Sequence, residues 1–262
     1  MRKIGINLHA VEGLTDEQYI KTIAELGFSA TFSGVCDKQR QHDIANLCAK
    51  YGVTYETLHA PFGKGNNNMW LEGAAGDTFL GELMRAVCHC AAAGVPVLVS
   101  HLSSGENAPS VTDVGRARYA RLVEYAASKN VKIAFENQRK LANLAWAMET
   151  FDDSVVGFCW DCGHESCFTP GRKYMPLFGD RLICTHIHDN FCVYNQDSHL
   201  LPFDGKKDFG EMADELRRSP FRGSLMLEVS ASHSDAYEGI SPEQYLIRAA
   251  EAAKKLADLV GE

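Results

Sequence analysis

Carboxylate and imidazole side chains follow a series of short apolar runs in this chain, each at the point where a run ends. The series comprises Glu136 in VKIAFEN, Asp161 and His164 in VVGFCWDCGH, His186 in RLICTHIHDN, and Glu228 in GSLMLEVS. Each run is typical of a buried strand. Carboxylate oxygens and imidazole nitrogens that converge on one point are ligands for a divalent metal ion. The sequence therefore predicts a metal centre where the ends of these strands meet.

Buried carboxylates strengthen this prediction, because burying one is costly unless it is paired or bound to a metal. No Lys or Arg lies in the strand ends to pair with Glu228. The set predicted to bind metal is Glu136, Asp161, His186 and Glu228. His188 shares a face with His186, so the strand pattern leaves the choice between them open. A lone histidine at a strand end is more often a hydrogen-bonded structural group than a functional one.

Eight β-rich runs alternate with longer helical patterns. The expected strands are 3–9, 28–34, 53–60, 95–102, 131–138, 154–162, 181–189 and 223–230. Their continuous apolar character suits strands covered on both faces, as in a parallel sheet. Thr15 with Gln18 fits a capping box, and Ser241 before Pro242 fits a helix start. Residues 163–180 contain Gly and Pro, which predict a long loop before the next helix.

Eight βα units in 262 residues match the size and order of a (β/α)8 TIM barrel, an α/β fold. A doubly wound sheet is the alternative, but no Gly-rich phosphate loop follows the first strand. Residues 1–262 contain no linker and are expected to form a single domain. Active sites of such barrels lie at the C-terminal ends of the strands. Six of the ten histidines lie there: His59, His101, His164, His186, His188 and His199.

Composition narrows the range of partners. The formal net charge of −8 argues against general attraction to nucleic acid or to an anionic membrane. No apolar stretch approaches the roughly 20 residues that cross a bilayer, and the first residues do not resemble a signal peptide, so a cytoplasmic location is expected. The nine cysteines are scattered and odd in number, which predicts buried reduced thiols. Strand alternation points Cys159 and Cys162 to opposite faces, so their CxxC does not indicate a redox site.

At these positions the chain resembles the xylose isomerase-like barrel superfamily. This superfamily comprises sugar and sugar-phosphate isomerases and epimerases, together with endonuclease IV-type abasic-site enzymes (AP endonuclease family 2). The matching pieces occur in order along nearly the whole chain: HAP at 59–61, SH at 100–101, EN at 136–137, DxGH at 161–164, HIHD at 186–189, DSH at 197–199 and LE at 227–228. In these families an acid follows the metal-binding histidine three residues later, which selects His186 over His188.

The resemblance implies one divalent ion held by Glu136, Asp161, His186 and Glu228, and no organic cofactor. Carboxylates with a single imidazole suit Mn²⁺, and Mg²⁺, Co²⁺ or Zn²⁺ are the alternatives. In the endonuclease branch further ligands complete a cluster of three zinc ions, and they match His59, His101, His164, Asp197 and His199. In sugar isomerases, histidines at these positions bind substrate hydroxyls instead. The acidic chain and its short loops favour a small sugar or sugar phosphate over nucleic acid.

The expected reaction is isomerisation or epimerisation by proton transfer next to a carbonyl, through a metal-stabilised enediolate. Glu136 and Glu228 are predicted to remove and return the proton. The predicted substrate-binding residues are His59, His101, His164, Asp197 and His199, with Phe62 and Trp70 as an apolar wall over the sugar. The alternatives are an endonuclease IV-type zinc-dependent abasic-site phosphodiesterase and a non-catalytic sugar-binding barrel.

The chain departs from the best-known ketose 3-epimerases at two positions. Their additional substrate-binding Glu would fall at Ala142, and their substrate Arg would fall at Cys192. The resemblance therefore does not imply a free-ketose 3-epimerase activity. Enzymes of this group are often dimers or tetramers, so the resemblance allows a homo-oligomer, and no membrane partner is expected.

Overall fold

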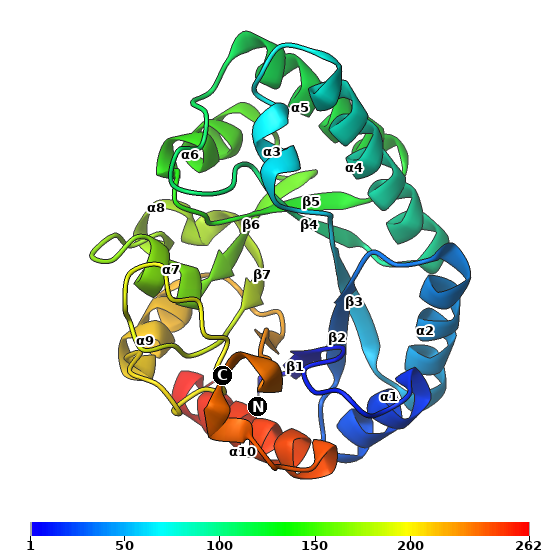
Figure 1. Cartoon of the computed structure of the whole chain (residues 1–262), viewed down its shortest axis with the longest axis vertical. Coiled ribbons are helices and arrows are strands. Elements are labelled where there is room, and N and C mark those ends of the chain that lie inside the picture. Colours follow the sequence, from blue (N-terminus) through cyan, green and yellow to red (C-terminus); the bar gives the residue numbers. More distant parts are fainter. Residues whose placement is uncertain (1, 262) are drawn as a thin grey trace. The chain divides into compact units, whose positions relative to one another are not determined.

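The computed structural model describes residues 2–261, in which strands and helices alternate along the chain (Figure 1). The strands are β1 (Ile4–Asn7), β2 (Ala30–Gly34), β3 (Thr54–His59), β4 (Val97–His101), β5 (Lys132–Glu136), β6 (Val156–Asp161), β7 (Leu182–His186) and β8 (Leu225–Leu227). Each strand lies inside one of the eight ranges expected from the sequence.

The helices follow the strands in the order expected for βα units. They are α1 (Asp16–Glu25), α2 (Lys38–Tyr51), α3 (Lys64–Asn68), α4 (Ala74–Ala93), α5 (Asp113–Ser128), α6 (Leu141–Thr150), α7 (Cys162–Phe168), α8 (Met175–Phe178), α9 (Phe209–Arg218) and α10 (Pro242–Val260). Three short 3-10 helices lie at Gly179–Arg181, Ala231–His233 and Asp235–Tyr237. Both predicted caps are present: Thr15 and Gln18 form a capping box on α1, and Ser241 caps α10.

The strands form one sheet in the order β7-β6-β5-β4-β3-β2-β1-β8. Neighbours pair in parallel, for example Gly5↔Ala30 and Ile4↔Leu225. β7 and β8 are the two edge strands of this sheet. A parallel bridge between Ile187, directly after β7, and Leu227 of β8 joins them, so the eight strands make a nearly closed barrel. The predicted α/β class and (β/α)8 barrel are confirmed, and the single domain over residues 1–262 stays a prediction.

The residues group into two compact units. The first unit comprises Met1–Ser33, Asp43–Tyr55 and Trp160–Glu262, and the second comprises Gly34–His42 and Glu56–Cys159. In the first unit α10 packs against α1 and α9, and in the second α4 packs along α5 (Figure 1). Among the described residues, no helix is both long enough and apolar enough to cross a membrane.

The segment after β6 differs from the sequence expectation of a long loop. α7 begins at Cys162, directly after the strand, because the Asp161 carboxylate accepts a hydrogen bond from the His164 backbone N–H at 2.6 Å and caps the helix. A Cβ at Gly163 would overlap the His188 ring, so this glycine allows a close approach and does not mark a loop.

The prediction of buried reduced thiols holds in part, because Cys88 and Cys192 are exposed and Cys36 is partly exposed. All nine are free thiols, and most are buried. Burial raises the pKa of the Cys162 thiol to about 12, so this group stays protonated near neutral pH. Cys159 and Cys162 are both free thiols in this structure.

Arg118 on α5 holds the segment that links α3 to α4 in the second unit. Its buried guanidinium donates to the Asp77 carboxylate at 3.0 Å. It also donates to the backbone carbonyl oxygens of residues 68, 69, 71 and 73 at 2.6–3.2 Å. One side chain therefore satisfies four backbone carbonyl groups between the end of α3 and the start of α4.

Replacing Arg118 by Met should lower the free energy of unfolding by about 3 kcal/mol or more, because each buried carbonyl left without a donor costs roughly 1–3 kcal/mol. Urea denaturation followed by circular dichroism measures this loss. Arg121→Met, at an exposed position of the same helix, is the control and should change the stability by less than about 0.5 kcal/mol. Equal losses in the two variants would contradict the structural role of Arg118.

Candidate metal centre

Three of the predicted ligands lie together in the first unit. Asp161 ends β6, His186 ends β7, and Glu228 follows β8 directly. Each offers one ligand atom, and these atoms lie within 4.8 Å of one another. Asp161 and His186 are fully buried, whereas the Glu228 side chain keeps 18% of its surface exposed. Glu228 is therefore the member of this group that an incoming molecule can reach.

The imidazole of His186 is fixed from two sides. Its ring stacks on Phe32, with ring centroids 4.6 Å apart and an interplanar angle of 13°. Its Nδ1 lies 3.2 Å from Glu228 Oε2. Phe32 packs in turn against Ala30 and Met226 in the core. The apolar core thus sets the plane of the imidazole at the end of β7.

The donor set fits a divalent cation. Two carboxylates and one imidazole are buried or half-buried together, and the ionic neighbours of Asp161 include His164 at 3.6 Å and His188 at 3.2 Å. Oxygen donors with imidazole are the ligands that Mn²⁺, Co²⁺ and Zn²⁺ accept. The three side chains can therefore hold such an ion.

A second group lies in the same unit and consists of His164, His188, Asp197 and His199, whose ligand atoms also lie within 4.8 Å of one another. Asp197 Oδ2 is 3.1 Å from His164 Nε2 and 3.2 Å from His199 Nε2. The His188 ring stacks on His199 with centroids 4.1 Å apart. His188 Nε2 is also 3.2 Å from Asp161 Oδ1, so this ring links the two groups.

Electrostatic effects within the second group are strong. Burial alone would raise the pKa of Asp197, but the hydrogen bonds from His164 and His199 outweigh it and hold that pKa well below its usual range. Burial opposes protonation of His199, yet the hydrogen bond to Asp197 and the nearby Glu228 raise its pKa to about 9. An ionised Asp197 facing a protonated His199 is therefore the state at neutral pH in the absence of a metal.

The loop that carries Asp197 and His199 is anchored by Asp189. The Asp189 carboxylate accepts hydrogen bonds from the backbone N–H groups of residues 190, 205 and 207 at 2.8–2.9 Å. Asp189 and Leu200 also form an isolated antiparallel bridge. The acid three residues after His186 thus shapes the loop after β7.

The second unit contains the remaining predicted residues. Glu136 ends β5, and its Oε2 lies 3.3 Å from the Nε2 atoms of both His59 and His101, which end β3 and β4. The Phe62 ring is 68% exposed and lies 5.1 Å from the His59 ring and 5.2 Å from the His101 ring, centroid to centroid. A buried carboxylate, two imidazoles and an exposed aromatic ring therefore lie together here.

Glu136, at the end of β5, pairs in register with a residue near the end of β6. Glu136 is the register partner of Cys159, and Asp161 follows Cys159 by two residues. Both strands run parallel, so their carboxyl ends carry Glu136 and Asp161 at the same edge of the sheet.

The structure does not support the predicted role of Trp70 as a wall over a sugar. Trp70 is 1% exposed, and its ring lies 4.9 Å from that of Tyr119 and 5.2 Å from that of Trp146. Its Nε1–H donates to the Leu102 carbonyl oxygen at 2.6 Å. A Cβ at Gly115 would overlap the indole, so α5 leaves room for it. Trp70 is a core residue, and Phe62 alone keeps the predicted apolar role.

His188 is the residue whose role the sequence did not reveal. The spacing HxH put it on the same face as His186, which was the available signal, but only as a competing ligand. Its ring instead belongs with His164, Asp197 and His199 and packs against Gly163. Strand periodicity gives the face of a side chain, but not which of two adjacent groups it joins.

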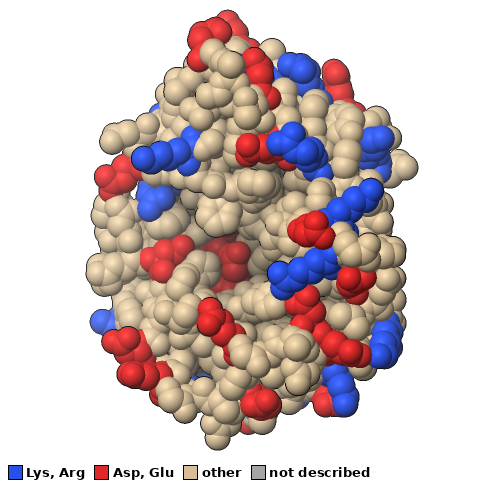
Figure 2. All heavy atoms as spheres, turned by 45° about the vertical axis from the view of Figure 1, so that its right-hand side comes forward, with Lys and Arg blue, Asp and Glu red and all other residues tan. Residues whose placement is uncertain are grey.

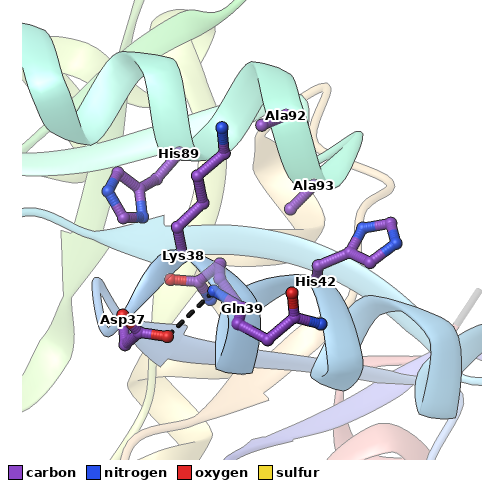
Figure 3. Close-up of a pocket in the computed structure, with 8 residues that line it drawn as sticks. Asp37, Lys38, Gln39, His42, His89, Ala92 and Ala93 are labelled. Atoms are coloured by element: carbon purple, nitrogen blue, oxygen red, sulfur yellow. Dashed lines mark hydrogen bonds between the residues drawn. The ribbon is translucent and has the colours of Figure 1, made fainter.

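A pocket of about 510 Å³ lies elsewhere in the second unit, between the first turn of α2 and α4 (Figure 3). Lys38 and His42 line it from α2, and His89 and Ala92 line it from α4. None of the residues predicted to carry chemistry lines this pocket. Figure 2 shows Lys and Arg interspersed with Asp and Glu on the face in view.

Known proteins resemble this chain in sequence and in fold. The uncharacterized protein y4fM of Sinorhizobium fredii (strain NBRC 101917 / NGR234) is 36% identical over 152 residues, which are 58% of this chain and 46% of that protein. The chain thus spans less than half of that relative.

Two solved structures share the fold of this chain at low sequence identity. A D-psicose 3-epimerase of Clostridium cellulolyticum H10 matches 99% of this chain and 100% of its own, with a TM-score of 0.81 and 14% identity. A fusion of a xylose isomerase-like TIM barrel with 4-hydroxyphenylpyruvate dioxygenase matches 99% of this chain and 43% of its own, with a TM-score of 0.78 and 14% identity.

Residues 20–256 match the family model described as xylose isomerase-like TIM barrel, AP_endonuc_2. The chain belongs to the xylose isomerase-like TIM-barrel family.

Proposed function

We propose that this protein is a divalent-metal-dependent sugar or sugar-phosphate isomerase or epimerase. The observation that carries the proposal is the convergence of Asp161, His186 and Glu228 at the carboxyl ends of three strands. This edge of a (β/α)8 barrel is where such enzymes place their chemistry. The similarity in fold to a D-psicose 3-epimerase supports the class of reaction.

Glu136 is proposed as the fourth ligand. Its carboxylate ends β5, the strand that pairs with β6, and its side chain is only 1% exposed. A carboxylate buried to this extent requires a positive partner, and both His59 and His101 face it. The set of three carboxylates and one imidazole favours Mn²⁺, with Mg²⁺, Co²⁺ or Zn²⁺ as alternatives.

When bound, the metal ion supplies a Lewis acid that stabilises negative charge on a substrate oxygen. Glu228 is proposed to remove a proton from the carbon next to the carbonyl, because its carboxylate is the accessible one of its group. Glu136 is proposed to return it. Both carboxylates are also ligands, which lowers their basicity, and the acidified substrate offsets this effect.

The remaining polar groups are proposed to orient the sugar. His59 and His101 present imidazole nitrogens beside the exposed ring of Phe62, an arrangement that suits hydroxyl groups on one side of a sugar and its apolar face on the other. His164, Asp197 and His199 are proposed to bind further hydroxyls. The partner is therefore a small polar molecule, and a nucleic-acid or membrane partner is not proposed.

Glu228→Gln should reduce proton exchange at the substrate carbon by at least about 100-fold, because it removes the base while keeping the shape of the side chain. The measurement is deuterium incorporation from D₂O into ketopentoses, ketohexoses and their phosphates, followed by NMR with the Mn²⁺-loaded protein. Glu149→Gln, at an exposed position of α6, is the matched control and should exchange like the unaltered protein. Absence of exchange by the unaltered protein across this panel would contradict the proposal, and retained sugar binding would then indicate a non-catalytic barrel.

An endonuclease IV-type zinc phosphodiesterase is the second candidate, and the group of His164, His188, Asp197 and His199 favours it. Three imidazoles and one carboxylate are a ligand set that tetrahedral Zn²⁺ accepts. Charge argues against it, because the chain carries −8, and on the face shown in Figure 2 acidic side chains lie among the basic ones.

Metal content separates the two candidates. Elemental analysis of the purified protein, together with anomalous scattering from crystals, should find one divalent ion per chain. A duplex with a single abasic site should remain uncut. Three zinc ions per chain and cleavage of that duplex would establish the endonuclease and overturn the isomerase.

A further inference from the structure

Glu228 lies just beyond the regular sheet. β8 ends at Leu227, and its pairing with β1 ends at Ile6↔Leu227. A side chain that must hold a metal and move a proton would lose positional accuracy on a free strand end. The backbone around Glu228 is nevertheless fully engaged: its N–H donates to the Ile187 carbonyl oxygen at 3.0 Å, and its carbonyl oxygen lies 2.8 Å from His199 Nδ1.

The next residue, Val229, is held by the side chain of Asn7. The Val229 N–H donates to Asn7 Oδ1 at 2.9 Å, and Asn7 Nδ2 donates to the Val229 carbonyl oxygen at 3.1 Å. Asn7 is the last residue of β1. Its carboxamide therefore pairs with a peptide group in both directions, as a strand residue would, and continues the β1–β8 ladder after the strand has ended.

Asn7 is itself held in place. The phenol of Tyr19, on α1, donates to the Asn7 carbonyl oxygen at 2.8 Å and accepts from the Ala10 N–H at 3.3 Å. Tyr19 is fully buried, and burial raises the pKa of its phenol above its ordinary value, so the donor stays protonated. Tyr19 of α1 thus holds Asn7, and Asn7 holds Val229, the residue after Glu228.

We infer that Asn7 is a positioning residue for Glu228, holding the backbone after β8 so that the carboxylate faces His186. This inference rests on the proposed function, in which Glu228 is a metal ligand. The neutral carboxamide offers a donor and an acceptor on separate atoms, which match the carbonyl oxygen and the N–H of Val229. Outer residues that orient a ligand typically change metal affinity 10- to 100-fold when they are replaced, roughly the effect expected at Asn7.

The test is Mn²⁺ binding to the full-length protein, measured by isothermal titration calorimetry and by electron paramagnetic resonance of free Mn²⁺. Asn7→Ala removes both hydrogen bonds, and Asn7→Leu removes them while keeping the volume of the side chain. Both variants should bind Mn²⁺ roughly 10- to 100-fold more weakly than the unaltered protein. Asn7→Leu keeps the test valid if the cavity left by Ala prevents folding.

Asn143→Ala is the matched control. Asn143 is a fully buried asparagine, whereas Asn7 is partly buried, and the Asn143 Nδ2 donates to the Pro109 carbonyl oxygen at 3.1 Å in the second unit. This variant should lose stability, seen as a lower melting temperature, and keep its Mn²⁺ affinity.

The outcomes distinguish the inference from the function on which it rests. If the unaltered protein does not bind Mn²⁺ or another divalent ion, the proposed function fails. If it binds Mn²⁺ and both Asn7 variants bind equally well, the metal centre stands and the role of Asn7 is overturned. If Asn143→Ala weakens Mn²⁺ binding as much as the Asn7 variants do, the effect is general instability, which also overturns the positioning role.

Discussion

The concentration of carboxylates at the ends of buried strands is the constraint on which the rest of this structure depends. Asp161 and Glu228 lie within reach of one another, and Asp161 is fully out of solvent. A low-dielectric environment cannot hold such groups ionised without positive charge close by. The histidines at the neighbouring strand ends, and the metal ion proposed to bind among them, answer this requirement. Fold stability and the proposed chemistry therefore depend on the same few side chains.

One carboxylate both caps a helix and belongs to the candidate metal centre. Asp161 accepts the His164 N–H as the N-cap of α7, and its carboxylate also lies close to the imidazoles of His164 and His188. Gly163, in the first turn of α7, leaves the space that the His188 ring occupies. Replacing either residue would move a helix and a candidate ligand together. This coupling explains why the βα turn after β6 is short, although its composition suggested a loop.

The sequence predicts the periodic part of the fold and the residue types of the site, but not the details of packing. Continuous apolar runs locate all eight strands, because a strand that is buried on both faces is apolar along its whole length. The sequence does not place Trp70, because a ring in the loop after a strand can face a ligand or the core, and here the space left by Gly115 holds it in the core. The pairing of Asn7 with Val229 joins residues 222 positions apart, so no local pattern could reveal it.

Charge balance shows which of the two groups in the first unit has the stronger need for a cation. In the second group one carboxylate, Asp197, meets three imidazoles, and a protonated His199 neutralises it without any metal. In the first group the two carboxylates of Asp161 and Glu228 outnumber the imidazole of His186, although Asp161 also lies 3.2 Å from His188 Nε2. Coulombic attraction inside a protein grows as the local dielectric constant falls, so a divalent ion gains most where this excess is buried. These charges support the proposed arrangement, in which one ion lies among Asp161, His186 and Glu228 and the second group is left free to bind hydroxyls.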